Sequence, residues 1–108
     1  MAVVQLAQRV RSDLPEPLSA NLLGTGTLIG AEVARAYLGT SRRHLLTHMT
    51  AARHACQEIQ YWLRLILAAD IASEEAVNPL LDEAHRLYNT IATICAKARQ
   101  NLESDAAR

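Results

Sequence analysis

One stretch of the chain, residues 41–69, carries an apolar pattern that leaves few folds open. Its apolar side chains recur at alternating spacings of four and three residues, at Leu45, Met49, Ala52, Cys56, Ile59, Leu63 and Ile66. This alternation is a heptad seam of about 3.5 residues per repeat, and it predicts a long helix packed along its length against other helices. Leu46, Trp62 and Leu67 widen the stripe, which favours a bundle core with a second interface.

A second long helix is expected toward the end of the chain, and its start has two candidates. The apolar residues on its broad face are Leu81, Ala84, Leu87, Tyr88, Ile91, Ile94, Cys95, Ala98 and Leu102. Asn78 and Pro79 read as an N-cap followed by the first helical residue. Ser73, Glu74 and Glu75 are an equally good start, with acids near the helix N-terminus, and Pro79 would then bend the helix.

The segment from Pro17 to about Gly39 is predicted to be helical despite its glycines. An apolar stripe recurs at helical spacing, at Leu18, Leu22, Ile29, Val33 and Ala36. Gly24, Gly26 and Gly30 each weaken a helix by about 1 kcal/mol relative to Ala. The glycine-rich run has neither a dinucleotide-binding nor a Walker motif, and no strand pattern precedes it. Close packing of helices therefore explains these glycines better than a phosphate-binding loop does.

A short first helix is expected at residues 1–11, where the apolar residues are Val3, Leu6, Ala7 and Val10. The four predicted helices are joined by short connections near residues 12–17, 39–41 and 70–78, with Thr40 or Ser41 as the N-cap of the third helix. Short connections make neighbouring helices antiparallel. We therefore predict an all-α fold with one domain over residues 1–108, an antiparallel up-and-down four-helix bundle with a short first helix.

Charge is balanced over the chain but unevenly placed along it. The 108 residues include 11 Lys+Arg and 11 Asp+Glu, so the net charge is zero, and the strongly basic total typical of nucleic-acid-binding proteins is absent. Residues 1–69 hold seven basic and four acidic groups, whereas residues 70–108 hold four basic and seven acidic groups. The two parts therefore carry net charges of +3 and −3.

Five arginines are the candidate binding residues: Arg35, Arg42, Arg43, Arg53 and Arg64. Such a basic patch could contact nucleic-acid phosphates or form one half of an ionic interface between protomers. The acidic partners available for an interface are Asp70, Glu74, Glu75, Asp82 and Glu83. Because the charges balance within the chain, an interface or an ordinary surface is favoured over nucleic acid.

Histidines provide a weaker candidate site. His44 and His48 lie four residues apart and would share one face of a helix. His85 is a third possible ligand, but it lies on another predicted helix and no HExxH context surrounds it. Hydrogen-bonded or solvated histidines are the favoured interpretation, so we expect no metal and no cofactor. Glu32 lies near a core face, and it either points to water or needs a partner, such as Arg35 or an Arg of a neighbouring subunit.

The remaining polar residues do not suggest catalysis. Adjacent acids such as Asp82 and Glu83 point about 100° apart on a helix, so they do not form a pair that shares a proton. The sequence shows no Ser/His/Asp or Cys/His arrangement typical of a nucleophile. The chain is therefore expected not to be an enzyme.

The placement of the cysteines and the hydropathy of the chain indicate in which cellular compartment the protein is expected. Cys56 and Cys95 fall inside apolar patterns, without CxxC spacing, and are expected to be reduced core residues. The N-terminal apolar run is too short and too interrupted for a signal peptide. No stretch approaches the roughly 20 apolar residues of a membrane span. We therefore expect a cytoplasmic protein that does not contact a membrane.

Two stretches of the chain resemble a known bacterial four-helix-bundle family. Residues 28–36, LIGAEVARA, resemble the start of its core, which continues without a gap into Ser41, Leu45, Met49, Ala52, Glu58, Ile59 and Leu63. Residues 68–75, AADIASEE, resemble the connection that follows. The family was first noticed as reading frames in intervening sequences of 23S rRNA genes, and its relatives include the accessory variability determinant of diversity-generating retroelements. The resemblance extends from about Leu14 to Ala98.

The resemblance implies an antiparallel bundle that assembles as a ring, often of five copies, and no catalytic activity. For the retroelement relatives it implies binding to a reverse transcriptase and to nucleic acid. Those relatives are markedly basic and this chain is neutral, so the ring is expected more readily than the nucleic-acid role.

These expectations combine into one functional hypothesis. We expect a non-enzymatic homo-oligomer, a pentameric ring by the resemblance, that contacts nucleic acid or a partner protein through its Arg-bearing surface. The alternatives are a purely structural bundle with no partner beyond itself, and a metal-binding protein based on His44, His48 and His85.

Overall fold

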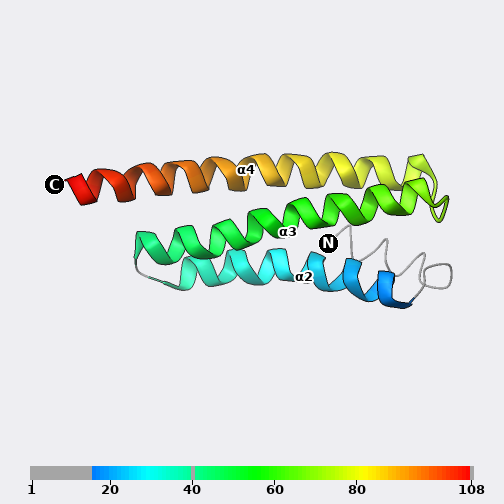
Figure 1. The fold of residues 1–108 in the computed structure, drawn as a ribbon, viewed down its shortest axis with the longest axis horizontal. Helices are drawn as coiled ribbons and strands as arrows, with labels where there is room; N and C mark the ends of the chain where they lie inside the picture. The colour runs from blue at the N-terminus through cyan, green and yellow to red at the C-terminus, as the bar shows by residue number, and fades with distance from the viewer. Residues whose placement is uncertain (1–15, 40, 108) are drawn as a thin grey trace.

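The computed structural model describes residues 16–39 and 41–107, which form three helices (Figure 1). These are α2 at Glu16–Leu38, α3 at Arg42–Ala68 and α4 at Glu74–Ala107. The predicted all-α fold and the antiparallel packing of neighbouring helices are confirmed. The described residues contain three helices rather than the predicted four, since the expected first helix at residues 1–11 lies outside them.

The central helix of the molecule is α3. α2 packs on one side of it and α4 on the other, and in the described part of the chain α2 and α4 do not contact each other (Figure 1). The molecule is elongated, with extents of 55 × 21 × 17 Å. Its length is set by α4, whose 34 residues span about 51 Å at 1.5 Å per residue.

The predicted heptad seam of α3 forms the core. Six of its seven residues are buried, namely Met49, Ala52, Cys56, Ile59, Leu63 and Ile66, and Leu45 packs partly buried against them. Facing residues come from both flanking helices, at Leu22, Ile29 and Ala36 of α2 and at Val77, Leu80, Ala84, Ile91, Cys95 and Ala98 of α4. Leu87 departs from the predicted face, because its side chain is 37% exposed.

Ser41, one of the two predicted N-cap residues, caps the N-terminus of α3. Its backbone is extended (φ −101°, ψ 150°), and its hydroxyl oxygen accepts a hydrogen bond of 3.0 Å from the backbone N–H of His44. This bond satisfies one of the N–H groups that the first turn of a helix leaves without a partner. The break between the end of α2 at Leu38 and the start of α3 at Arg42 falls where the sequence predicts it.

Replacing Ser41 by Ala should lower the free energy of unfolding by about 1 kcal/mol, because the cap bond is lost while the helix stays intact. Urea unfolding followed by circular dichroism would measure the change. Ser104→Ala, at an exposed position in the last turns of α4, is the matched control and should cost nothing. A Ser41→Ala protein as stable as the wild type would show that the cap contributes no stability.

The turn between α3 and α4 uses a left-handed residue. Asp70 has a φ of 57°, a conformation that Asp tolerates better than most non-glycine residues. The backbone N–H of Asp70 donates a hydrogen bond to the carbonyl oxygen of Leu67 (3.1 Å). The backbone N–H of Ile71 donates one to the carbonyl oxygen of Ile66 (3.0 Å). This is the Schellman arrangement, which ends α3 and satisfies its last carbonyl groups.

Of the two starts proposed for the last helix, the structure has the earlier one. α4 begins at Glu74, and the hydroxyl of Ser73 accepts a hydrogen bond of 3.3 Å from the backbone N–H of Ala76. Pro79 therefore lies inside the helix. A start at Asn78 is wrong, because burial of Val77 and Leu80 holds the preceding turn against the core.

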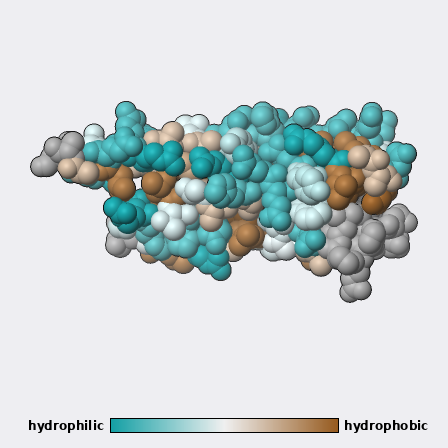
Figure 2. Space-filling model, viewed as in Figure 1, coloured by the Kyte–Doolittle hydropathy of each residue, from teal (hydrophilic) through white to brown (hydrophobic). Residues whose placement is uncertain are grey.

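The face of the molecule shown in Figure 2 is mostly hydrophilic, with hydrophobic residues gathered near the α3–α4 turn. The large exposed hydrophobic residues are Leu23, Leu28, Tyr37, Leu38, Tyr61, Leu65 and Leu87. Not one of the three described helices combines the length and the apolar character that a membrane crossing requires.

Candidate functional site

A polar cluster joins α2 to α3 around the carboxylate of Glu32. One carboxylate oxygen, Oε1, accepts a hydrogen bond of 2.7 Å from a guanidinium nitrogen of Arg35, and the other, Oε2, lies 2.6 Å from Nδ1 of His48. The Glu32 side chain is only 12% exposed. Arg35 is one of the partners that the sequence predicts for Glu32. His48 is an additional partner that sequence reasoning missed, since the pairing depends on how α2 and α3 are aligned.

His44 lies beside this cluster, at the end where α2 turns into α3. Its Nε2 is 2.8 Å from the carbonyl oxygen of Arg35, and its ring centroid is 4.5 Å from that of His48. The ring lies directly against Gly39, where an added Cβ would meet its atoms at 2.0 to 2.6 Å. Glycine at this position therefore allows the imidazole to reach the backbone of α2.

Arg35, His44 and His48 line a shallow pocket of about 220 Å³, together with Leu38 and Gly39. Both histidines are hydrogen-bonded, as the sequence predicts. His85 lies exposed on α4, on the far side of α3, so it does not join them. Within residues 16–39 and 41–107, no three His, Cys, Asp or Glu side chains are placed to hold a metal ion. The hydrogen bonds of this cluster join α2 to α3.

Hydrogen bonds from His48 and Arg35 hold the pKa of Glu32 below its ordinary value of 4.5, against the opposing effect of burial. Because the pKa is lowered in the folded state, ionised Glu32 stabilises the protein above pH 4.5 and loses that effect as the pH falls through the folded value. Glu32→Gln should therefore lower the free energy of unfolding at neutral pH. The difference in unfolding free energy between the wild type and the variant should become smaller in acid.

Urea unfolding of the wild type and of Glu32→Gln over a series of pH values would test this prediction. Glu103→Gln, which removes an exposed carboxylate from α4, is the control and should follow the wild-type curve. Parallel curves for the wild type and Glu32→Gln would contradict the proposed role of the carboxylate.

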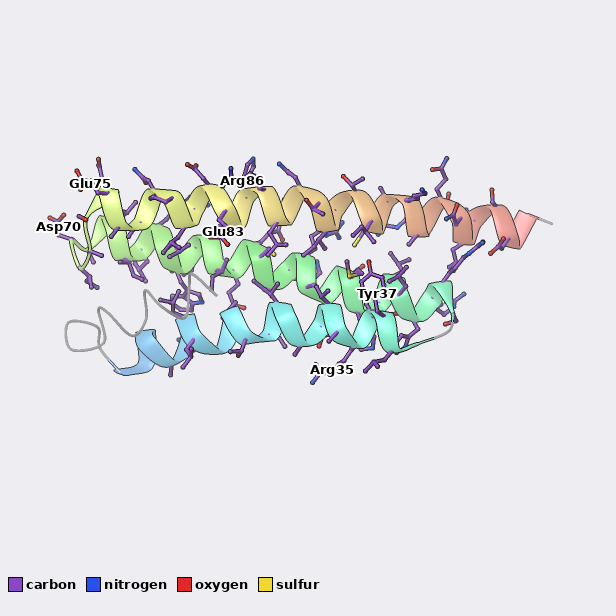
Figure 3. The ribbon with its side chains drawn as sticks, turned by 180° about the vertical axis from the view of Figure 1, so that it is seen from behind. Arg35, Tyr37, Asp70, Glu75, Glu83 and Arg86 are labelled. Atoms are coloured by element: carbon purple, nitrogen blue, oxygen red, sulfur yellow. The ribbon has the colours of Figure 1, made fainter. Side chains whose placement is uncertain are left out.

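The five candidate arginines do not gather at one point. Arg42, Arg53 and Arg64 are spaced by eleven residues, about three turns or 16 Å each, so they form a line on one face of α3. Arg43 points about 100° away from that line. Arg35 lies on α2 and projects from its outer edge (Figure 3).

Several of these arginines already have partners within the chain. Arg35 is paired with Glu32, and Arg42 forms an ion pair with Asp105 near the end of α4. A guanidinium nitrogen of Arg64 lies 3.4 Å from the side-chain oxygen of Gln60. The exposed Arg42–Asp105 pair contributes little to stability, so its side chains can exchange partners at small cost.

An apolar groove runs between α2 and α4, over α3. It has a volume of about 270 Å³, and its apolar walls are formed by Ile29, Val33, Ile59, Leu80, Ala84 and Leu87. Gly30 lines the groove from α2 and leaves open space where a Cβ would be. Among the described residues of the lining, Glu83 is the charged one, and it lies on the inner side of α4 (Figure 3).

The groove follows from the way the helices are arranged. Because α2 and α4 each contact α3 but not one another in the described part of the chain, the space between them is not closed by their own side chains. The exposure of Leu87 is explained in the same way. No protein-family model, curated protein or solved structure matches this chain. The groove and the charged residues around it are therefore what points to a function.

Proposed function

We propose that the chain is a non-enzymatic helical assembly module that forms a homo-oligomer. The observation that carries this proposal is the apolar groove between α2 and α4. An open apolar groove of about 270 Å³, with further large hydrophobic residues exposed elsewhere on the surface, is typical of a surface that binds another protein. A net charge of zero means that copies of the chain do not repel one another.

The four-helix bundle belongs to this proposal. In an up-and-down four-helix bundle, helices that are diagonal to each other do not touch, and α2 and α4 have that relationship across α3. Residues 1–11 would supply the fourth helix.

The order of the oligomer and the partner come from the resemblance to the 23S rRNA intervening-sequence family. That resemblance supports a ring of five copies, with the Arg-bearing surface of α2 and α3 available to a partner protein or to nucleic acid. Arg42 and Arg53 suit an extended partner better than a small ligand, because they lie about 16 Å apart on one face of α3.

Size-exclusion chromatography with light scattering at moderate salt tests the assembly. Five copies of 11.9 kDa would give a mass of about 60 kDa, and a mass near 12 kDa at tens of micromolar would contradict the proposal. Fluorescence anisotropy with labelled single-stranded RNA and duplex DNA at two salt concentrations tests the partner, since phosphate contacts weaken as salt rises.

A further inference from the structure

The outer face of α3 carries an apolar ridge in addition to the groove. Tyr61 is 57% exposed and Leu65, one turn later on the same face, is 37% exposed. Trp62 packs edge-on against Tyr61, with ring centroids 5.1 Å apart, and its indole N–H donates a hydrogen bond of 3.3 Å to Glu58. Tyr61 thus packs against a hydrogen-bonded Trp62, and aromatic residues of this type are the common anchors of protein interfaces.

The ridge and the groove lie on opposite sides of the same helix. Ile59 is buried at the floor of the groove, and Tyr61, two residues later, points about 200° away from it around the helix axis. Leu65, six residues after Ile59, points about 240° away in the same sense, and so lies within about 40° of Tyr61. One copy of the chain therefore cannot place its own ridge in its own groove.

Opposite charges flank the two surfaces. Arg64 lies between Tyr61 and Leu65 in the sequence, and its guanidinium donates a long hydrogen bond to the side-chain oxygen of Gln60. Glu83 lines the groove, and other acids, Asp82 and Glu75, lie on the same half of α4. An apolar ridge beside a positive charge complements an apolar groove that contains a negative charge, and both belong to the same chain.

We propose that the groove between α2 and α4 receives the Tyr61–Leu65 ridge of a second copy of this chain, with Arg64 of that copy next to Glu83. This inference rests on the proposed homo-oligomer and names the surfaces that form it. Because donor and acceptor are different surfaces, the contact is head-to-tail. A head-to-tail contact repeats from copy to copy and closes into a ring when the rotation permits.

Two matched glycine variants test the groove. Gly24 and Gly30 both lie in α2, and at both positions an added Cβ meets no atom within 4 Å. Replacing either glycine by Gln therefore raises the helix propensity of α2 by the same amount. Gly30 lines the groove and Gly24 does not. Light scattering should give a monomer of about 12 kDa for Gly30→Gln and the wild-type mass for Gly24→Gln. Circular dichroism confirms that each variant is folded.

A mixing experiment tests the head-to-tail pairing. A ridge variant, Tyr61→Gln with Leu65→Gln, should also be monomeric. Mixed in equal amounts, the groove variant and the ridge variant should form a heterodimer of about 24 kDa, because the intact ridge of one fits the intact groove of the other and no further copy can add.

The outcomes separate this inference from the proposed function. A monomeric wild type would overturn the homo-oligomer itself. An oligomeric wild type with an equally oligomeric Gly30→Gln would overturn the groove as the contact and leave the homo-oligomer standing. Two monomeric variants that form no complex on mixing would overturn the head-to-tail pairing, since each surface would then bind its own kind.

Discussion

Leu63→Ala should lower the free energy of unfolding by about 3 kcal/mol. Leu63 is a fully buried member of the heptad seam of α3, the one helix that both described neighbours contact. Truncation removes buried apolar surface and leaves a cavity that rigid helices on both sides cannot close. Urea unfolding at a fixed protein concentration measures the loss, and the fixed concentration matters because association shifts apparent stability.

Leu38→Ala is the matched control for this experiment. Leu38 ends α2 and is 82% exposed, so the same chemical change there should alter the unfolding free energy by less than about 0.5 kcal/mol. Equal losses at the two positions would mean that Leu63 does not lie in a closely packed core. A loss at Leu38 alone would place that side chain in an interface.

The second large effect is expected at the buried thiols. Burial raises the pKa of Cys56 to about 11, from an ordinary value of 9.0. This shift alone reduces the reactive thiolate about a hundredfold at mildly alkaline pH. Cys95 is also a free thiol with no exposed surface. Alkylation by iodoacetamide should therefore be at least about a hundredfold slower at Cys56 in the folded protein than in denaturant.

Mass spectrometry of the alkylated protein over time would measure both rates, and Cys56→Ala would assign the rate that belongs to Cys95. Rates in the folded protein close to those in denaturant would show that α3 and α4 separate readily in solution. Such a result would contradict the packing of these two helices described above.

Much of the fold could be predicted from local patterns in the sequence. The seam of α3 was predictable because a heptad repeat places an apolar residue on the buried face at every turn of the helix. The connection before Ser41 was predictable because a capping hydroxyl marks a helix start. The start of α4 was not, because both Ser73 and Asn78 satisfy the local rules. Burial of Val77 and Leu80 against the other helices decided between them.

The candidate site was harder to predict, since it depends on how the helices are aligned. Nothing in the sequence pairs Glu32 with His48, sixteen residues away on the next helix. The five arginines look like one patch in the sequence, but helix geometry distributes them along α3 and onto α2. The apolar groove exists because α2 and α4 stay apart, and no local pattern reports a space between helices.

The placement of α3 between α2 and α4 also bears on how the chain folds. In the described residues every contact between helices joins neighbours in the chain, α2 with α3 and α3 with α4. Short chain separations of this kind are typical of proteins that fold within microseconds to milliseconds. The two helical hairpins share α3 alone, so either outer helix can detach while the other stays docked. The backbone amides of α3 would then be the last to exchange with solvent, because only the loss of both hairpins exposes them.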